Sequence, residues 1–197
     1  MMKKIFTVAC LALSLAAYAQ KIKIVEGSLA PLKGQKSVFA QFTYNDMLIG
    51  AKGIPEKEYL EKRKSELNEK EPGRGDKFAE SWVTDRKERF EPQFRELFNK
   101  YSDMSSVDEK AQYTIIFHTT RTEVGFNVGV ASKPAYIDAE VTVVETANPS
   151  KVVAKITIIK ALGYQAMGYD FETGVRLTEA YAKSGKELGK LIVKEAK

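Results

Sequence analysis

The sequence predicts an α+β or mixed α/β fold, with a mostly antiparallel sheet that includes a C-terminal hairpin and is layered with helices. Three observations predict it. Residues 135–162 alternate apolar and polar side chains and are rich in β-branched residues, which is typical of two strands joined by a turn. Residues 55–101 and 170–193 carry apolar side chains at helical spacing. A lone hairpin is marginal in water, so we expect further strands and a helix that covers its apolar face.

The start of the chain predicts a secretory signal peptide. Two lysines precede an apolar run over residues 5–17, and a small-x-small cleavage site ends at Ala19. The run is shorter than the roughly 20 residues of a spanning helix. A buried N-terminal helix is the alternative interpretation. We expect cleavage after Ala19, an exported protein in the periplasm or outside the cell, and a single domain over residues 20–197.

The cysteine content decides which cysteine-dependent sites the mature chain can have. Cys10 is the only cysteine and lies within the predicted signal peptide. A lipid anchor on Cys10 is a second possibility, but the apolar run before it is short and apolar residues continue after it. The mature chain then has no cysteine, which excludes a disulfide framework, a thiol nucleophile and a thiolate metal site.

Charge and hydropathy bound the function further. The formal charge falls from +5 to +3 once Lys3 and Lys4 leave with the signal peptide. The remaining charges are interleaved, as on a soluble surface, so we expect no nucleic-acid partner. A second long apolar run is missing, so we expect no transmembrane segment in the mature chain.

The other elements follow from local patterns. Pro55 suits the first position of a helix, and the polar stretch at 69–76 predicts a mobile loop before a helix capped by Asp76. Residues 124–130 fit a short strand or a loop. In chain order, the predicted elements are strands at 21–26 and 38–48, helices at 55–70 and 76–101, strands at 112–120, 135–146 and 151–162, and a helix at 170–193.

The second predicted helix carries an aromatic stripe. Its members recur at helical spacing and are Phe78, Trp82, Phe90, Phe94, Leu97 and Tyr101. The stripe could pack on the sheet or line a ligand cleft. Pro92 interrupts it, and a proline inside a helix costs about 3 kcal/mol, so we expect a kink or a second helical piece that opens at Pro92.

The last predicted helix should cover the hairpin. Its packing face should bury Val175, Ala182, Leu188 and Ile192, while Lys183, Lys186, Lys190 and Lys194 stay wet. Gly185 and Gly189 lie on the same face, and each costs about 1 kcal/mol relative to alanine. We expect both glycines to face the sheet, where missing side chains permit a close approach.

Candidate catalytic residues are few. His118 is the only histidine and lies in a predicted strand, so it has no histidine or cysteine partner in the mature chain for a zinc site or a triad. Asp138 and Glu140 are two residues apart on one strand, and such carboxylates could do acid–base work or form a solvated face. Arg74-Gly75-Asp76 spells an integrin-binding tripeptide that short polar loops often contain by chance.

The layout resembles a known group of proteins. The segments that carry the resemblance are residues 129–135 (GVASKPA), the hairpin AEVTVVETANPSKVVAKI and the helix YDFETGVRLTEAYAKSGKELGKLIVKEA. They resemble uncharacterised bacterial exported or envelope proteins whose α/β domain is similar to the periplasmic domain of curli-secretion proteins. The resemblance implies an exported α/β domain and supplies no catalytic residues. This chain departs from the lipoproteins of that group because it lacks a suitable anchor cysteine.

Two functions follow. The first is a non-enzymatic binding or assembly module of the periplasm or cell surface, with an envelope protein as possible partner and with no cofactor or metal. Such a module should carry an apolar patch or groove. The alternative is a small-ligand binder or hydrolase with a site near His118, Asp138 and Glu140. The missing catalytic constellation favours the first.

Overall fold

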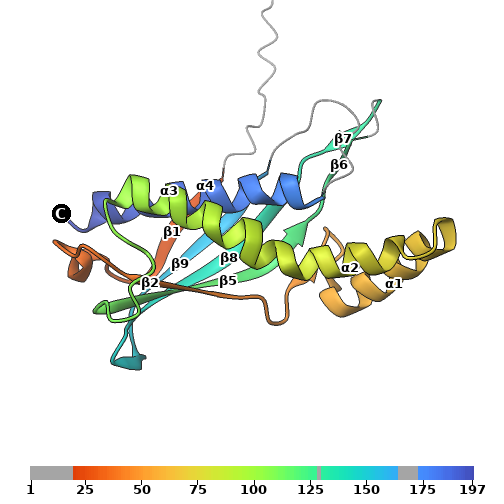
Figure 1. Ribbon diagram of the computed structural model, residues 1–197. Coiled ribbons are helices and arrows are strands. Elements are labelled where there is room, and N and C mark those ends of the chain that lie inside the picture. Colours follow the sequence, from red (N-terminus) through yellow and green to blue (C-terminus); the bar gives the residue numbers. More distant parts are fainter. Residues whose placement is uncertain (1–19, 128–129, 164–172) are drawn as a thin grey trace, which may run out of the picture.

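The structure is a computed structural model that describes residues 20–127, 130–163 and 173–197. The predicted signal peptide and the first three residues of the helix predicted at 170–193 lie outside these ranges. Within them, one mixed sheet carries helices on one of its faces (Figure 1), which confirms the predicted α+β fold. Among the described helices, none combines the length and the hydropathy that crossing a membrane requires.

The predicted order of elements is largely present. The strands are β1 (Lys21–Gly27), β2 (Phe39–Thr43), β3 (Leu48–Ile49), β4 (Ile54–Pro55), β5 (Tyr113–Glu123), β6 (Phe126–Asn127), β7 (Ser132–Lys133), β8 (Tyr136–Glu145) and β9 (Asn148–Leu162). The helices are α1 (Glu56–Lys70), α2 (Arg74–Asp85), α3 (Glu91–Ser102) and α4 (Thr173–Glu195). The predicted strand at 38–48 is divided, because Asp46 has a left-handed φ of 56° that turns the chain between β2 and β3.

The strands of the main sheet follow the order β1-β9-β8-β5-β3-β4, with β2 also beside β5. β2 and β3 run parallel to β5, and the other pairs are antiparallel. The long strand β5 therefore joins the C-terminal hairpin to the N-terminal strands.

The hairpin of β8 and β9 has the predicted buried face. Ile137, Val141 and Ile156 are at most 1% exposed, and Val141 lies opposite Ile156 in the register. The predicted turn at residues 147–150 is wrong by about two residues, because Glu145 pairs with Asn148 and the chain reverses between them. Pro149 lies near the start of β9, where the register is irregular and a missing ladder donor is tolerated.

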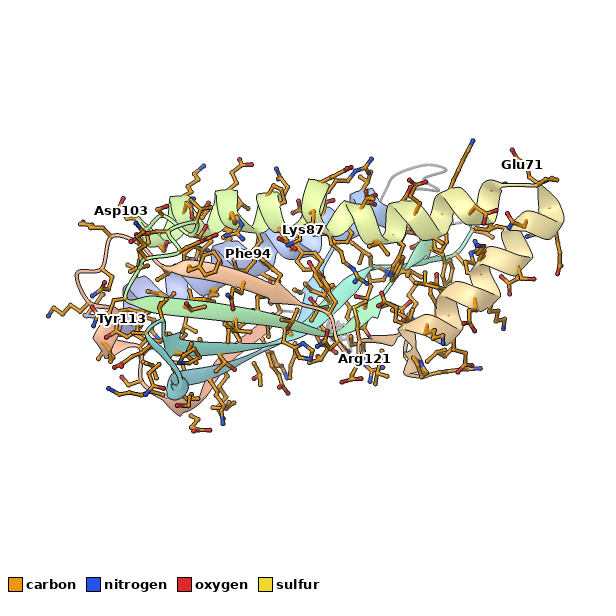
Figure 2. All side chains as sticks on the ribbon, turned by 60° about the horizontal axis from the view of Figure 1, so that its bottom comes forward. Glu71, Lys87, Phe94, Asp103, Tyr113 and Arg121 are labelled. Atoms are coloured by element: carbon orange, nitrogen blue, oxygen red, sulfur yellow. The ribbon has the colours of Figure 1, made fainter. Side chains whose placement is uncertain are left out.

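The aromatic helix is divided as Pro92 predicts. α2 continues through a π-helical turn at Arg86–Phe90 into α3, which has Pro92 in its first turn. A π turn accommodates the backbone acceptor that a proline leaves without a donor. We call α2, this turn and α3 the rod. Figure 2 shows Phe94 of the rod between α3 and the sheet, where its ring centroid is 4.9 Å from that of Phe117 on β5.

The expected mobile loop at residues 69–76 is a tight turn. Gly73 has a φ of 83°, and α2 begins at Arg74. Asp76 is not the N-cap, as the sequence predicted, but lies in the first turn of α2 and accepts a hydrogen bond from Asn68 of α1. Together α1 and α2 form a helical hairpin that extends beyond the end of the sheet (Figure 1), with Glu71 at its tip (Figure 2). We call it the arm.

Gly185 and Gly189 of α4 face α3, not the sheet as predicted. A Cβ atom at Gly185 would lie 2.2 Å from the carbonyl oxygen of Phe94, and one at Gly189 would lie 3.0 Å from that of Phe98. The sheet is contacted instead by the neighbouring large side chains. The two glycines therefore set the distance between the helices of the covering layer.

The buried face of α4 agrees with the prediction except at its start. Ala182, Leu188 and Ile192 are at most 3% exposed, whereas Val175 is 43% exposed and was predicted wrongly. At the start of α4 the buried positions are shifted, so that Arg176 and Leu177 are buried in place of Val175. Lys190 and Lys194 are exposed, and Lys183 and Lys186 are half-buried.

The glycine contact predicts an unusual stability result. Gly185→Ala should lower the free energy of unfolding by about 1–3 kcal/mol through overpacking, although alanine gains about 1 kcal/mol in helix propensity. Urea denaturation measures the difference. Lys190→Ala on the exposed side of α4 should change stability far less, and a Gly185→Ala protein more stable than wild type would show that α4 does not approach α3 in this way.

Candidate functional site

A large hollow among the described residues lies between the arm and the rest of the domain. It has a volume of about 970 Å³, at the upper end of the range for ligand pockets. α1 and α2 form one side of it, and Val124, Gly125 and Phe126 and the start of α4 form the other. We call it the arm groove. The arm and the β6–β7 hairpin project from the same end of the sheet (Figure 1).

Three aromatic rings form the apolar part of the arm groove. Tyr59 of α1 lies 5.5 Å from Trp82 of α2 between ring centroids, and Phe78 lies 5.9 Å from Trp82. Trp82 is buried, while Tyr59 and Phe78 are half-buried and lie nearer to solvent. Phe126 on the opposite wall is 46% exposed. The groove therefore offers apolar surface on both walls.

A polar contact fixes the base of the arm. Glu56, in the first turn of α1, accepts hydrogen bonds from the indole N–H of Trp82 and from the guanidinium of Arg86. Arg86 also lies 4.3 Å above the ring of Tyr44. Because the indole donor of Trp82 is already used, this residue contributes its ring alone to the groove.

The arm groove has a surplus of positive charge. Its charged lining consists of Lys62, Arg63, Arg74, Lys77, Arg89 and Arg176 against Glu58, Glu66 and Asp85. Two of the carboxylates are already paired, since Arg63 holds Glu66 and Arg89 holds Asp85, each at 3.1 Å. Within the described part of the chain, Lys62 and Lys77 have no carboxylate within 4.0 Å. The groove thus suits an anionic ligand with apolar groups.

The two interpretations of the aromatic stripe each apply to part of it. Phe94 packs on the sheet against Phe117, and Phe90 stacks on Tyr181 of α4 at a centroid distance of 4.8 Å. Phe78 and Trp82 instead line the arm groove, which Phe90 also touches. The stripe changes from core to groove where the rod leaves the sheet.

His118 lies on the face of the sheet that is opposite to the helices. Its Nδ1 atom is 2.9 Å from the hydroxyl of Thr43, and the two share a hydrogen bond. Glu140 is the cross-strand neighbour of His118 on β8. Among the described residues, however, no carboxylate comes within hydrogen-bond distance of the imidazole. The geometry does not supply the partner that a general base requires, and a catalytic role of His118 stays a hypothesis.

The two predicted carboxylates have different surroundings. Asp138 accepts a hydrogen bond from the backbone N–H of Lys160 at 2.8 Å, and its other oxygen lies 3.6 Å from Nε of Arg121. Glu140 is exposed. Neither residue lines the arm groove, and the described residues contain no cluster of three or more His, Cys, Asp or Glu side chains that could hold a metal ion.

The sequence predicted only one part of the groove, because a ligand cleft was one of the two interpretations of the aromatic stripe and the opposite wall was not foreseen. Phe78 and Trp82 are four residues apart on a predicted helix, and Tyr59 lies on the helix before it. Once residues 69–76 are recognised as a turn between two antiparallel helices, the three rings are expected on facing surfaces. The opposite wall, with Phe126, comes from a segment that local patterns left open.

Comparisons with known proteins find likeness in structure alone. No protein-family model matches the chain, and no curated protein matches it in sequence. The PelC dodecamer from Paraburkholderia phytofirmans matches 88% of this chain and 97% of its own, with 11% identity and a TM-score of 0.44. Protein XCC0632 from Xanthomonas campestris, of the DUF330 family, matches 85% of this chain and 90% of its own, with 12% identity and a TM-score of 0.34. Both are bacterial proteins, and likenesses of this size carry no argument about function.

Buried phenols predict how stability depends on pH. Burial raises the pKa of Tyr59 above its ordinary value of 10.0, and it also raises those of Tyr44 and Tyr181. Above pH 10.0 the folded protein therefore binds more protons than the unfolded chain, so the free energy of unfolding falls as pH rises. Urea denaturation between about pH 9 and 11 measures the slope.

Tyr59→Phe is the matched control for this titration. It removes one of the phenols and should make the fall of stability shallower. If tyrosinate absorbance instead rose fully at pH 10.0 in the folded protein, with unchanged stability, the phenols would be open to solvent and the arm would not pack as described.

Proposed function

We propose that this protein is an exported, non-enzymatic binding module of the bacterial cell envelope that holds its ligand in the arm groove. The observation that carries the proposal is the groove itself, with its aromatic rings and with Lys62 and Lys77, which have no carboxylate of the described residues within 4.0 Å. The predicted signal peptide, with cleavage after Ala19, supports export. The part of the lining that the structure describes offers no nucleophile with an adjacent base, which supports binding over catalysis.

The arm groove is a better candidate than the open face of the sheet. Ligand sites are usually concave and combine apolar surface with a few polar groups. The groove has this form, whereas His118 and Glu140 lie on a sheet face and line none of the hollows described for the chain. A hydrolase or small-ligand site on that face remains the alternative function.

A groove-filling variant tests the proposal. Ser81 of α2 is exposed and lines the groove, so Ser81→Tyr should occupy the ligand's place without removing a packed side chain. Val83 is 53% exposed on the same helix and does not line the groove, so Val83→Tyr is the matched control. Trp82 is the only tryptophan, and its fluorescence reports on the groove.

The probe is a bacterial envelope extract separated into fractions. We expect at least one fraction to change the fluorescence of Trp82 in the wild type and in Val83→Tyr, and to bind Ser81→Tyr about tenfold more weakly or not at all. Equal responses of all three proteins would contradict the proposal. A response that survives in Ser81→Tyr but is lost in His118→Ala would favour the alternative site on the sheet.

A further inference from the structure

The chemistry of the lining narrows the class of ligand. This step rests on the proposed function, since it concerns the same groove. Apart from the aromatic residues, the only uncharged hydrogen-bonding side chains in the lining are those of Ser81 and Thr173, and the described lining contains no Asn, Gln or His. Neutral hydroxyl groups gain little from a surplus of basic side chains, so the lining favours an anionic ligand over a neutral sugar.

The pattern along α1 also argues against an acyl chain. The residues of α1 that line the groove place charged side chains between the apolar ones: Tyr59 and Leu67 are accompanied by Lys62, Arg63, Glu58 and Glu66. A hydrocarbon chain needs a continuous apolar channel, because unpaired charges beside it are costly to desolvate. The apolar groups of the lining and its surplus of basic side chains match instead a polymer that carries both apolar and acidic side chains.

Both helices of the arm carry basic side chains that have no carboxylate of the described residues within 4.0 Å. Lys62 belongs to α1 and Lys77 to α2, and Arg74 beside them holds Glu71 only at 3.7 Å on the exposed surface. Two of the acidic groups of the groove already serve Arg63 and Arg89. An incoming carboxylate would therefore meet cations whose charge is not neutralised by the described residues.

We propose that the arm groove binds an extended acidic peptide segment of a partner protein. Apolar side chains of the segment lie on Tyr59 and Phe78, with Phe126 on the opposite wall. Its carboxylates pair with Lys62 and Lys77 at the rim. The volume of about 970 Å³ suits a short segment, not a folded domain. The protein then acts as a receptor for a linear acidic motif.

Peptide selection tests this inference while the partner is still unidentified. A randomised peptide library displayed on phage is selected on the full-length mature protein, with depletion on Ser81→Tyr. The expected result is enrichment of peptides that combine Asp or Glu with aromatic or large aliphatic residues. Enrichment of neutral or basic peptides, or equal recovery on Ser81→Tyr, would overturn the proposal.

Charge neutralisation supplies a second, independent readout. Lys62→Gln together with Lys77→Gln should weaken the selected peptides about tenfold and make their affinity less dependent on salt. Lys57→Gln with Lys70→Gln removes the same charge from the same arm at positions outside the groove, and it should leave affinity within about twofold of wild type. If both pairs had equal effects, the attraction would be general and the assignment to the groove would be wrong.

Protease treatment of the envelope fraction that changes the fluorescence of Trp82 distinguishes a failure of this inference from a failure of the proposed function. Digestion of that fraction with protease should abolish its effect on the wild-type protein. If the effect survives digestion and is still lost in Ser81→Tyr, the groove is a binding site but its ligand is no peptide, and a glycan or an anionic lipid takes its place. If no fraction acts and no peptide is selected, the proposed function itself fails.

Discussion

The close contact between α3 and α4 is the constraint on which the rest of the structure depends. Gly185 and Gly189 bring the two helix backbones close together: a Cβ atom at Gly185 would overlap the carbonyl oxygen of Phe94, and one at Gly189 would be in tight contact with that of Phe98. Each glycine costs about 1 kcal/mol in helix propensity, which the packing of the helical layer on the sheet offsets. With the helices this close, Phe94 and Leu188 are both fully buried over the sheet.

The position of the groove follows from that layer. α3 is fixed against α4 and the sheet, and the rod continues through its π turn into α2 without a loop. The arm is therefore an extension of a packed helix, and its orientation is set at the π turn and by the contacts of Glu56 with Trp82 and Arg86. The result is a groove between the arm and the rest of the domain. The groove stays open because the rod, which carries the arm, is fixed by its packing on α4 and the sheet.

Sequence patterns predict the parts of this structure that depend on neighbours along the chain. Alternation predicted the buried face of β8 and β9, and Pro92 predicted the division of the long helix, because both effects are local. Gly185 and Gly189 were correctly placed on the packing face of the helix, but the sheet was wrongly predicted as their neighbour. The helical pattern shows which face is buried and does not show which element covers it. The groove as a whole could not be predicted for the same reason. It joins Tyr59, Phe78 and Phe126, which only the tertiary fold brings together.

The central claim is that the packed rod holds the arm in one orientation over the groove. Because the mature chain is predicted to have no cysteine, spin labels can be placed at Glu71→Cys on the arm tip and Gln41→Cys on β2, both exposed. Their distance distribution, measured by pulsed electron paramagnetic resonance, tests the claim directly. We expect one narrow distribution that broadens when Gly185→Leu disturbs the contact of α3 with α4. A broad or divided distribution in the otherwise native protein would contradict it.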